Sequence, residues 1–298
     1  MVYIPVMDNS TLLTSMETLI EKASTVLPHG ITEALLKAYA REAENSIARS
    51  TLGMILESAQ KSRDSRLPIC QDTGSILAMV RAVPNDSFFA IEKAIKNAVK
   101  SLTVRGILRQ NCVDPISGTN TGDNIGEHVP QIHFLPSRGP TMISVMLKGG
   151  GSENVSTQYS LPDSSLDAGR DLDGVRKCIL DALIRAQGKG CAPGIIGACI
   201  GGDRASGFSL AKEMLFRRLD EPNPIEILGR LEDTIVEQAN SLGIGPMGLG
   251  GMTTLLGARI GCAGRHPASY FVTVSYSCWA TRRYGIELDV EGRIARWL

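Results

Sequence analysis

Apolar residues recur every three or four positions in several stretches of the chain, a spacing that predicts amphipathic helices. The first stretch runs from a cap at Ser10 or Thr11 to about Pro28, and the second from Thr32 to Leu56. Residues 1–65 are therefore expected to form a helical N-terminal part. The same spacing predicts four further helices, over residues 87–104, 166–187, 206–216 and 224–242.

Short, continuous apolar runs bounded by glycine, proline or polar residues predict β-strands. They cover residues 75–83, 142–147, 195–200, 253–260, 270–277 and 285–290. Residues 105–140 are rich in Asn, Asp, Gly and Pro and show little periodicity, as long functional loops often do. Helices and strands mix without a regular βαβ repeat. The predicted fold class is therefore α/β or α+β, with residues 1–298 forming a single intertwined domain.

Charge and composition exclude several classes of function. The 298 residues include 31 basic and 31 acidic side chains, so no net positive charge attracts nucleic acid or an anionic membrane. No apolar run approaches the roughly 20 residues of a membrane span. The start of the chain lacks the basic and apolar regions of a secretory signal, so we expect a cytoplasmic location.

The seven cysteines, with no signal sequence visible, argue against a disulfide framework. Three of them lie in apolar surroundings and are expected to be small buried side chains: Cys178, Cys199 and Cys262. Cys70, Cys191 and Cys278 instead lie at element boundaries beside glycine or polar residues. They are much farther apart in sequence than the Cys-x-x-Cys pairs of many metal sites, so their spacing alone does not predict a metal. Three thiolates from distant loops can nevertheless converge on one cluster.

Several polar residues are candidates for chemistry. Gln71 and Asp72 directly follow the first of these boundary cysteines, and Asp72 can act as a general acid or base or can simply close an Asx turn. Arg109 can clamp a substrate carboxylate through two hydrogen bonds or remain solvated. His266 can transfer protons near neutral pH or serve as a hydrogen-bonded structural residue.

Two glycine-rich segments offer backbone N–H groups to an anion. Gly149–Gly151 follows a predicted strand, and Gly243–Gly251 has five glycines in nine residues. Neither has the Gly-Lys-Ser/Thr ending of a Walker loop, and no Gly-x-Gly-x-x-Gly opens a helix. A nucleotide-binding protein without metal is still an alternative, as is a non-catalytic scaffold with buried thiols.

Four segments together resemble the class I fumarase and L-tartrate dehydratase family. More narrowly, they resemble its alpha subunit, which corresponds to the N-terminal domain of the single-chain members. The segments are Leu67-Pro68-Ile69-Cys70-Gln71-Asp72-Thr73-Gly74, Lys148–Asn154, Gly243–Gly248 and Ser277–Arg283. The Cys-Gln-Asp-Thr-Gly and Cys-Trp-Ala sequences are specific, and the glycine loops are less so.

The resemblance implies an oxygen-sensitive hydro-lyase with a 4Fe-4S cluster. It assigns as cluster ligands Cys70, Cys191 and Cys278. It assigns to substrate binding Gln71, Asp72, Arg109, Gly150 and Gly151. It assigns catalytic roles to Asp72 and His266.

The resemblance also implies partners. The second domain of the single-chain members would come from a separate beta subunit, in a dimer of alpha-beta units acting on a small dicarboxylate. The primary base can then lie on either chain. Residues 148–154 and 120–124 favour fumarate hydratase, an enzyme of the tricarboxylic acid cycle, over the alternative of L-tartrate dehydratase.

Overall fold

The computed structural model describes residues 8–82 and 87–298. Val83, the expected end of a strand, and the first seven residues lie outside this part. The chain forms two compact units, each assembled from segments that are not contiguous in the sequence. Unit 1 consists of Met1–Pro28, Ser58–Lys148 and Arg282–Leu298, and unit 2 of His29–Glu57 and Gly149–Thr281. The predicted mixture of helices and strands is confirmed.

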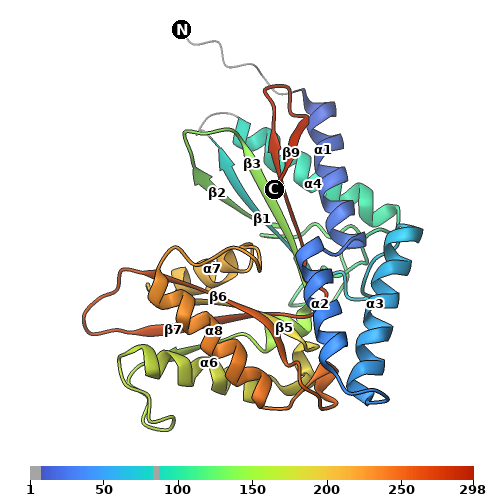
Figure 1. Cartoon of the computed structure of the whole chain (residues 1–298). Helices are drawn as coiled ribbons and strands as arrows, with labels where there is room; N and C mark the ends of the chain where they lie inside the picture. Colours follow the sequence, from blue (N-terminus) through green and yellow to red (C-terminus); the bar gives the residue numbers. More distant parts are fainter. Residues whose placement is uncertain (1–7, 83–86) are drawn as a thin grey trace. The chain divides into compact units, whose positions relative to one another are not determined.

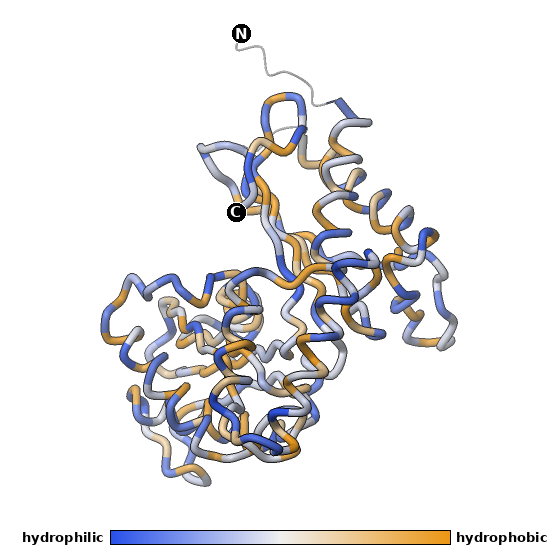
Figure 2. The backbone as a smooth tube through the Cα atoms, turned by 45° about the vertical axis from the view of Figure 1, so that its right-hand side comes forward, coloured by the Kyte–Doolittle hydropathy of each residue, from blue (hydrophilic) through white to orange (hydrophobic). Residues whose placement is uncertain are grey.

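Unit 1 contains a five-stranded sheet with the strand order β2-β1-β3-β8-β9 (Figure 1). β1 and β2 are parallel and the other neighbours are antiparallel. The strands are β1 (Ser75–Ala82), β2 (Gln131–Pro136), β3 (Met142–Lys148), β8 (Arg282–Leu288) and β9 (Ile294–Trp297). Helices α1 (Asn9–Thr25) and α4 (Ser87–Val104) share one hydrophobic core with β1, β3 and β8. Along the helices hydrophobic and polar residues alternate, as expected for helices with one buried face (Figure 2).

Helix α1 begins earlier than the sequence predicts. The Asp8 carboxylate accepts a hydrogen bond from the N–H of Thr11 at 3.0 Å, which satisfies one of the donors exposed at a helix start. The cap is therefore Asp8 rather than Ser10 or Thr11. The buried face of the helix follows the predicted spacing through Leu12, Met16, Leu19 and Ile20.

The single helix expected over residues 32–56 is in fact two helices, α2 (His29–Arg41) and α3 (Ile47–Ser65). Glu42, at the break, is 4% exposed, and its carboxylate accepts from the N–H groups of Met252 at 2.9 Å and Thr253 at 3.0 Å. Hydrogen bonds to residues more than 200 positions away thus fix the break. That prediction was wrong because periodicity does not register such distant partners.

Unit 2 contains a four-stranded sheet with the order β4-β7-β5-β6. Its strands are β4 (Thr157–Ser160), β5 (Gly194–Gly201), β6 (Leu255–Ala263) and β7 (Phe271–Ser277). Helices α6 (Leu172–Ala186) and α8 (Glu226–Ser241) pack on one face, and α7 (Arg204–Met214) packs on the other (Figure 1). Both faces of β5 are therefore covered, which explains why its whole sequence is apolar or glycine.

Most of the predicted elements are present. Helix α6 starts at Leu172 rather than near Leu166, because the Asp171 carboxylate caps it through the N–H of Gly174. The strands β2, β4 and β9 were not predicted. Across residues 8–82 and 87–298, no helix combines the length and the apolar character that a membrane crossing requires.

Candidate functional site

The turn between α3 and β1 in unit 1 carries three predicted site residues, namely Cys70, Gln71 and Asp72. Oδ1 of Asp72 accepts from the N–H of Gly74 at 2.8 Å, so the Asx turn considered for this aspartate is present. Gly74 has φ +84°, and a Cβ there would lie 2.7 Å from the backbone carbon of Lys148. Only glycine fits at this position, and its presence fixes the direction of the turn.

Arg109 is joined to the same turn. Its N–H donates to Oγ1 of Thr73 at 3.0 Å, and its carbonyl accepts from Nδ2 of Asn124 at 2.6 Å. The side chain of Arg109 is exposed. The structure therefore brings the backbone of Arg109 next to the Asp72 turn, with Thr73 between them.

Asn124 organises the segment that presents Arg109. It is 5% exposed, and its Oδ1 accepts from the N–H groups of Asn111 at 2.7 Å and Cys112 at 3.1 Å. Its Nδ2 also donates to Oγ1 of Thr103 at 2.9 Å. From the sequence alone, residues 120–124 serve only to distinguish fumarate hydratase from tartrate dehydratase, and this role is missed because the partners of Asn124 lie 12 to 21 positions away.

In unit 2, two predicted ligand cysteines lie at the same end of the sheet. Cys191 precedes β5 in a left-handed conformation with φ +56°, and its carbonyl accepts from the N–H of Trp279 at 3.2 Å. Cys278 follows β7, and its N–H donates to Oγ of Ser152 at 3.1 Å. Both cysteines are half-buried. One backbone hydrogen bond thus joins their two segments.

Tyr276 lies beneath the turn that carries Cys191. It is 2% exposed, and its ring occupies the space that side chains at two glycines would need. A Cβ at Gly194 would lie 2.1 Å from Cζ, and one at Gly190 would lie 2.5 Å from Cε1. Burial raises the pKa of the Tyr276 phenol, and the nearby thiols of Cys278 and Cys191 raise it further. The tyrosine is therefore a neutral packing partner of this turn.

Gly150 and Gly151 begin a short helix, α5 (Gly150–Asn154), although a loop was expected there. A Cβ at Gly151 would lie 3.2 Å from the carbonyl oxygen of Lys189. Ser152, in the same helix, accepts the hydrogen bond from Cys278. The two glycines therefore belong to the same neighbourhood as the cysteines of unit 2.

His266 lies in the turn between β6 and β7, where it is exposed and its Nδ1 accepts from the N–H of Ala268 at 3.1 Å. Cys278 follows the opposite end of β7, so the length of the strand, roughly 20 Å at 3.3 Å per residue, separates the two. Within this chain, His266 is not next to Cys191 or Cys278.

The other cysteines differ among themselves. Cys178 and Cys199 are buried as predicted, and burial raises the pKa of their thiols to about 12 and about 11. Cys262 is exposed, so the prediction that it is buried was wrong; it lies near the end of the edge strand β6. All seven cysteines lie in the described part of the chain, and none of them forms a disulfide.

The donor chemistry of the predicted ligands fits an iron-sulfur cluster, for which thiolates are the preferred ligands. The three cysteines are half-buried, unlike Cys178 and Cys199. Cys70 belongs to unit 1, and Cys191 and Cys278 belong to unit 2. Within residues 8–82 and 87–298, no preformed group of three or more His, Cys, Asp or Glu side chains is arranged to hold a metal ion.

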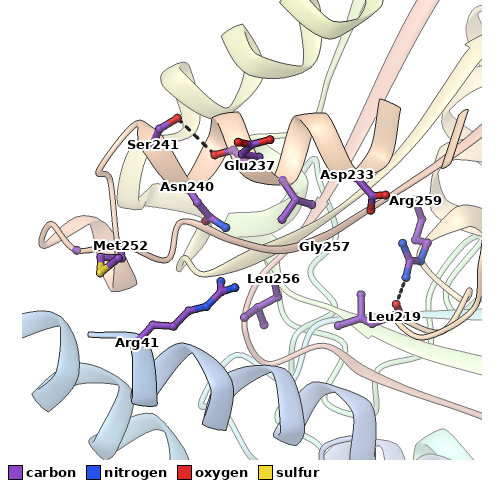
Figure 3. A pocket seen from close by; sticks show the side chains of 12 residues that line it. Arg41, Leu219, Asp233, Glu237, Asn240, Ser241, Met252, Leu256, Gly257 and Arg259 are labelled. Carbon is purple, nitrogen blue, oxygen red and sulfur yellow. Dashed lines mark hydrogen bonds between the residues drawn. The ribbon is translucent and has the colours of Figure 1, made fainter. Parts of the chain in front are cut away.

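Unit 2 also has a cavity of about 850 Å³ between α2, α8 and β6 (Figure 3). Arg41 reaches across it from α2 toward Leu256, and Asp233 and Glu237 line it from α8. No cysteine and no predicted site residue lines this cavity. It is therefore separate from the candidate site.

Comparison with known proteins identifies the family. The sequence profile described as fumarate hydratase (Fumerase) matches residues 13–287. The chain belongs to the fumarate hydratase family. It is 47% identical over 289 residues to a protein of Geobacillus stearothermophilus provisionally named fumarate hydratase class I. The match covers 95% of this chain and 56% of the relative.

Several relatives are named as alpha subunits. A Methanocaldococcus jannaschii protein provisionally named L(+)-tartrate dehydratase subunit alpha is 35% identical, over 89% of this chain and 93% of the relative. The L(+)-tartrate dehydratase subunit alpha of Escherichia coli K12 is 30% identical, over 87% and 85%. The chain thus spans about half of the Geobacillus relative and most of each alpha subunit.

Proposed function

We propose that the chain is the alpha subunit of a 4Fe-4S hydro-lyase that hydrates fumarate to L-malate. A beta subunit completes the site, in a dimer of alpha-beta units. One observation carries the proposal: Cys191 and Cys278, both half-buried, lie at the same end of the unit 2 sheet, and a backbone hydrogen bond joins their segments. The identity of 47% to a relative named as a class I fumarate hydratase supports it.

In this proposal, Cys70, Cys191 and Cys278 would hold the cluster. Once bound, the cluster supplies a Lewis acid for the hydroxyl group that is added or lost. Cys178 and Cys199 are fully buried in unit 2, with no exposed surface that could contact a cluster, so they are not proposed as ligands. The proposed enzyme works in the cytoplasm, where thiols stay reduced and available as cluster ligands.

Arg109 binds a substrate carboxylate. Its backbone is held at both ends of the residue, by Thr73 and Asn124, while its side chain is exposed and able to reach a ligand. A guanidinium matches a carboxylate with two parallel hydrogen bonds. Gln71, Gly150 and Gly151 contribute further polar contacts to the dicarboxylate.

Asp72 handles the proton on the substrate carbon next to the second carboxylate. The hydrogen bond from the Gly74 N–H to Oδ1 orients the Asp72 carboxylate, as general acid-base catalysis requires. The primary base can still lie on the beta subunit. A catalytic role for His266 would require it to serve the site of a second chain, because it lies at the far end of β7 from Cys278.

L-tartrate dehydratase is the second candidate, supported by the alpha subunits with 35% and 30% identity.

To decide between the two activities, the chain is purified anaerobically with its beta subunit and reconstituted with iron and sulfide. We expect a broad visible absorbance, about four irons per chain, and faster malate formation from fumarate than oxaloacetate formation from L-tartrate. A colourless, iron-free protein after reconstitution would contradict the proposal.

Cysteine variants test the ligand set. We expect Cys70→Ser, Cys191→Ser and Cys278→Ser each to lose the visible absorbance and most of the iron. Cys178→Ser and Cys199→Ala are the matched controls and should keep both. Full iron content in any of the first three variants would remove that residue from the ligand set.

A further inference from the structure

Arg282, the first residue of β8, is 1% exposed and is among the largest fully buried side chains of the described residues. Its Nη1 donates to the carbonyl oxygen of Asp72, 210 positions earlier. Within residues 8–82 and 87–298, its Nε has no hydrogen-bond partner and no carboxylate pairs with the guanidinium. A full positive charge is therefore buried in unit 1 with one hydrogen bond.

A second buried arginine shows the usual arrangement. Arg259 in unit 2 is 8% exposed, and its Nη1 lies 3.1 Å from the Glu232 carboxylate. Its Nε donates to the carbonyl oxygen of Arg218 at 2.9 Å. Burying an unpaired charge is costly, so a guanidinium without such partners is poorly explained by folding stability.

We propose that Arg282 is a positioning residue for the turn that carries Cys70 and Asp72. The bond from Nη1 holds the peptide group between Asp72 and Thr73. The side chain on one side of this peptide is the proposed proton-transfer group, and the one on the other side accepts the N–H of Arg109. The buried guanidinium of Arg282 therefore orients the side chains of both Asp72 and Thr73.

This inference rests on the proposed function for its catalytic consequence. The positional part depends only on the hydrogen bond to Asp72.

The test compares Arg282→Met and Arg282→Lys with the wild type, each as the full chain with its beta subunit. In Arg282→Met we expect kcat to fall about 10- to 100-fold, because the proton-transfer group is displaced. KM should rise by no more than about threefold, the effect expected if the contact between Thr73 and Arg109 is also lost. Arg282→Lys restores the charge and one donor and should recover most of the loss. The melting temperature of the cluster-free chain should stay the same or rise in Arg282→Met, because an unpaired buried charge is removed.

Hydrogen exchange of the cluster-free chain provides a measurement independent of activity. Peptides covering residues 67–76 should exchange several-fold faster in Arg282→Met, and peptides from α6 should not change. The control is Arg293→Met, on the exposed turn between β8 and β9, where Arg293 Nε bonds the Asp289 carboxylate at 3.0 Å. It should behave as the wild type in every measurement.

Two results would overturn the inference. One is unchanged exchange over residues 67–76 together with a kcat within twofold of the wild type. The other is a fall in melting temperature of more than about 5 °C with faster exchange throughout unit 1, which would make Arg282 a structural residue. If the wild type itself neither hydrates fumarate nor dehydrates tartrate, the proposed function fails, and hydrogen exchange alone decides the role of Arg282.

Discussion

The turns that carry the predicted cluster ligands are built differently in the two units. In unit 1, side-chain hydrogen bonds hold the Cys70–Asp72 turn, through Thr73, Asn124 and Arg282. In unit 2, close packing holds the Cys191 turn, where Gly190 and Gly194 leave room for the ring of Tyr276.

This difference indicates different tasks and different sensitivities. Directional hydrogen bonds orient side chains, and the unit 1 turn carries the residues proposed to bind the substrate and move a proton. Glycine packing places the backbone itself, and unit 2 contributes mainly cysteines held on that backbone. We therefore expect the Cys191 turn to be sensitive mainly to added volume, and the Cys70–Asp72 turn, apart from its close approach at Gly74, to be sensitive mainly to lost polar groups.

The largest effect is expected for Gly194→Ala in unit 2. The new methyl group would lie 2.1 Å from Cζ of Tyr276, so either the ring or the strand must move. We expect the free energy of unfolding, measured by urea denaturation, to fall by about 3 kcal/mol.

Two further variants sharpen this prediction. Gly229→Ala in α8, where the nearest atom would be 3.5 Å away, should stabilise the protein by up to about 1 kcal/mol, because alanine favours the helix. In a Tyr276→Ala background, Gly194→Ala should cost less than about 1 kcal/mol. An undiminished cost in that background would show that the contact with the ring is not the reason.

The next effect is expected for Asn124→Ala in unit 1. It removes four hydrogen bonds, so the carbonyl of Arg109 and the N–H groups of Asn111 and Cys112 lose their partner. Unfolding free energy should fall by about 2 kcal/mol, and KM should rise several-fold because the Arg109 segment loosens. The matched control is Asn120→Ala in the same segment, where the side chain is exposed, with an expected loss within about 0.5 kcal/mol. Equal losses of unfolding free energy in the two variants would show that Asn124 does not organise the segment that presents Arg109.

The smallest effect is expected for Thr73→Val. Valine keeps the shape of the 1% exposed side chain but removes the Oγ1 that accepts the N–H of Arg109. We expect a loss of about 1 kcal/mol in unfolding free energy and a rise in KM of about threefold. Thr73→Ser keeps the hydroxyl group and should retain the KM of the wild type. A wild-type KM in Thr73→Val would show that the hydrogen bond between Thr73 and Arg109 does not contribute to substrate binding.

Much of the fold follows from local pattern. The period of apolar residues predicts α4 at its observed bounds, and the apolar run that follows Ser75 predicts β1. The short strand β2 escaped prediction because Gln131–Pro136 lies in a segment rich in proline and polar residues and becomes a strand only by pairing with β1. The same holds for the break at Glu42, which depends on Met252 and Thr253.

The sequence by itself determined the family, the mixed α/β class and the list of candidate ligands, since these rest on residue types and short motifs that need no distant partner. Only the tertiary structure decided which residues hold the site in place. Asn124, Tyr276 and Arg282 act through contacts with residues far along the chain, and no local signal distinguishes them from a turn asparagine, a core tyrosine and a surface arginine. Burial and hydrogen bonding between distant segments give these three side chains their roles, and both arise only when the chain is folded.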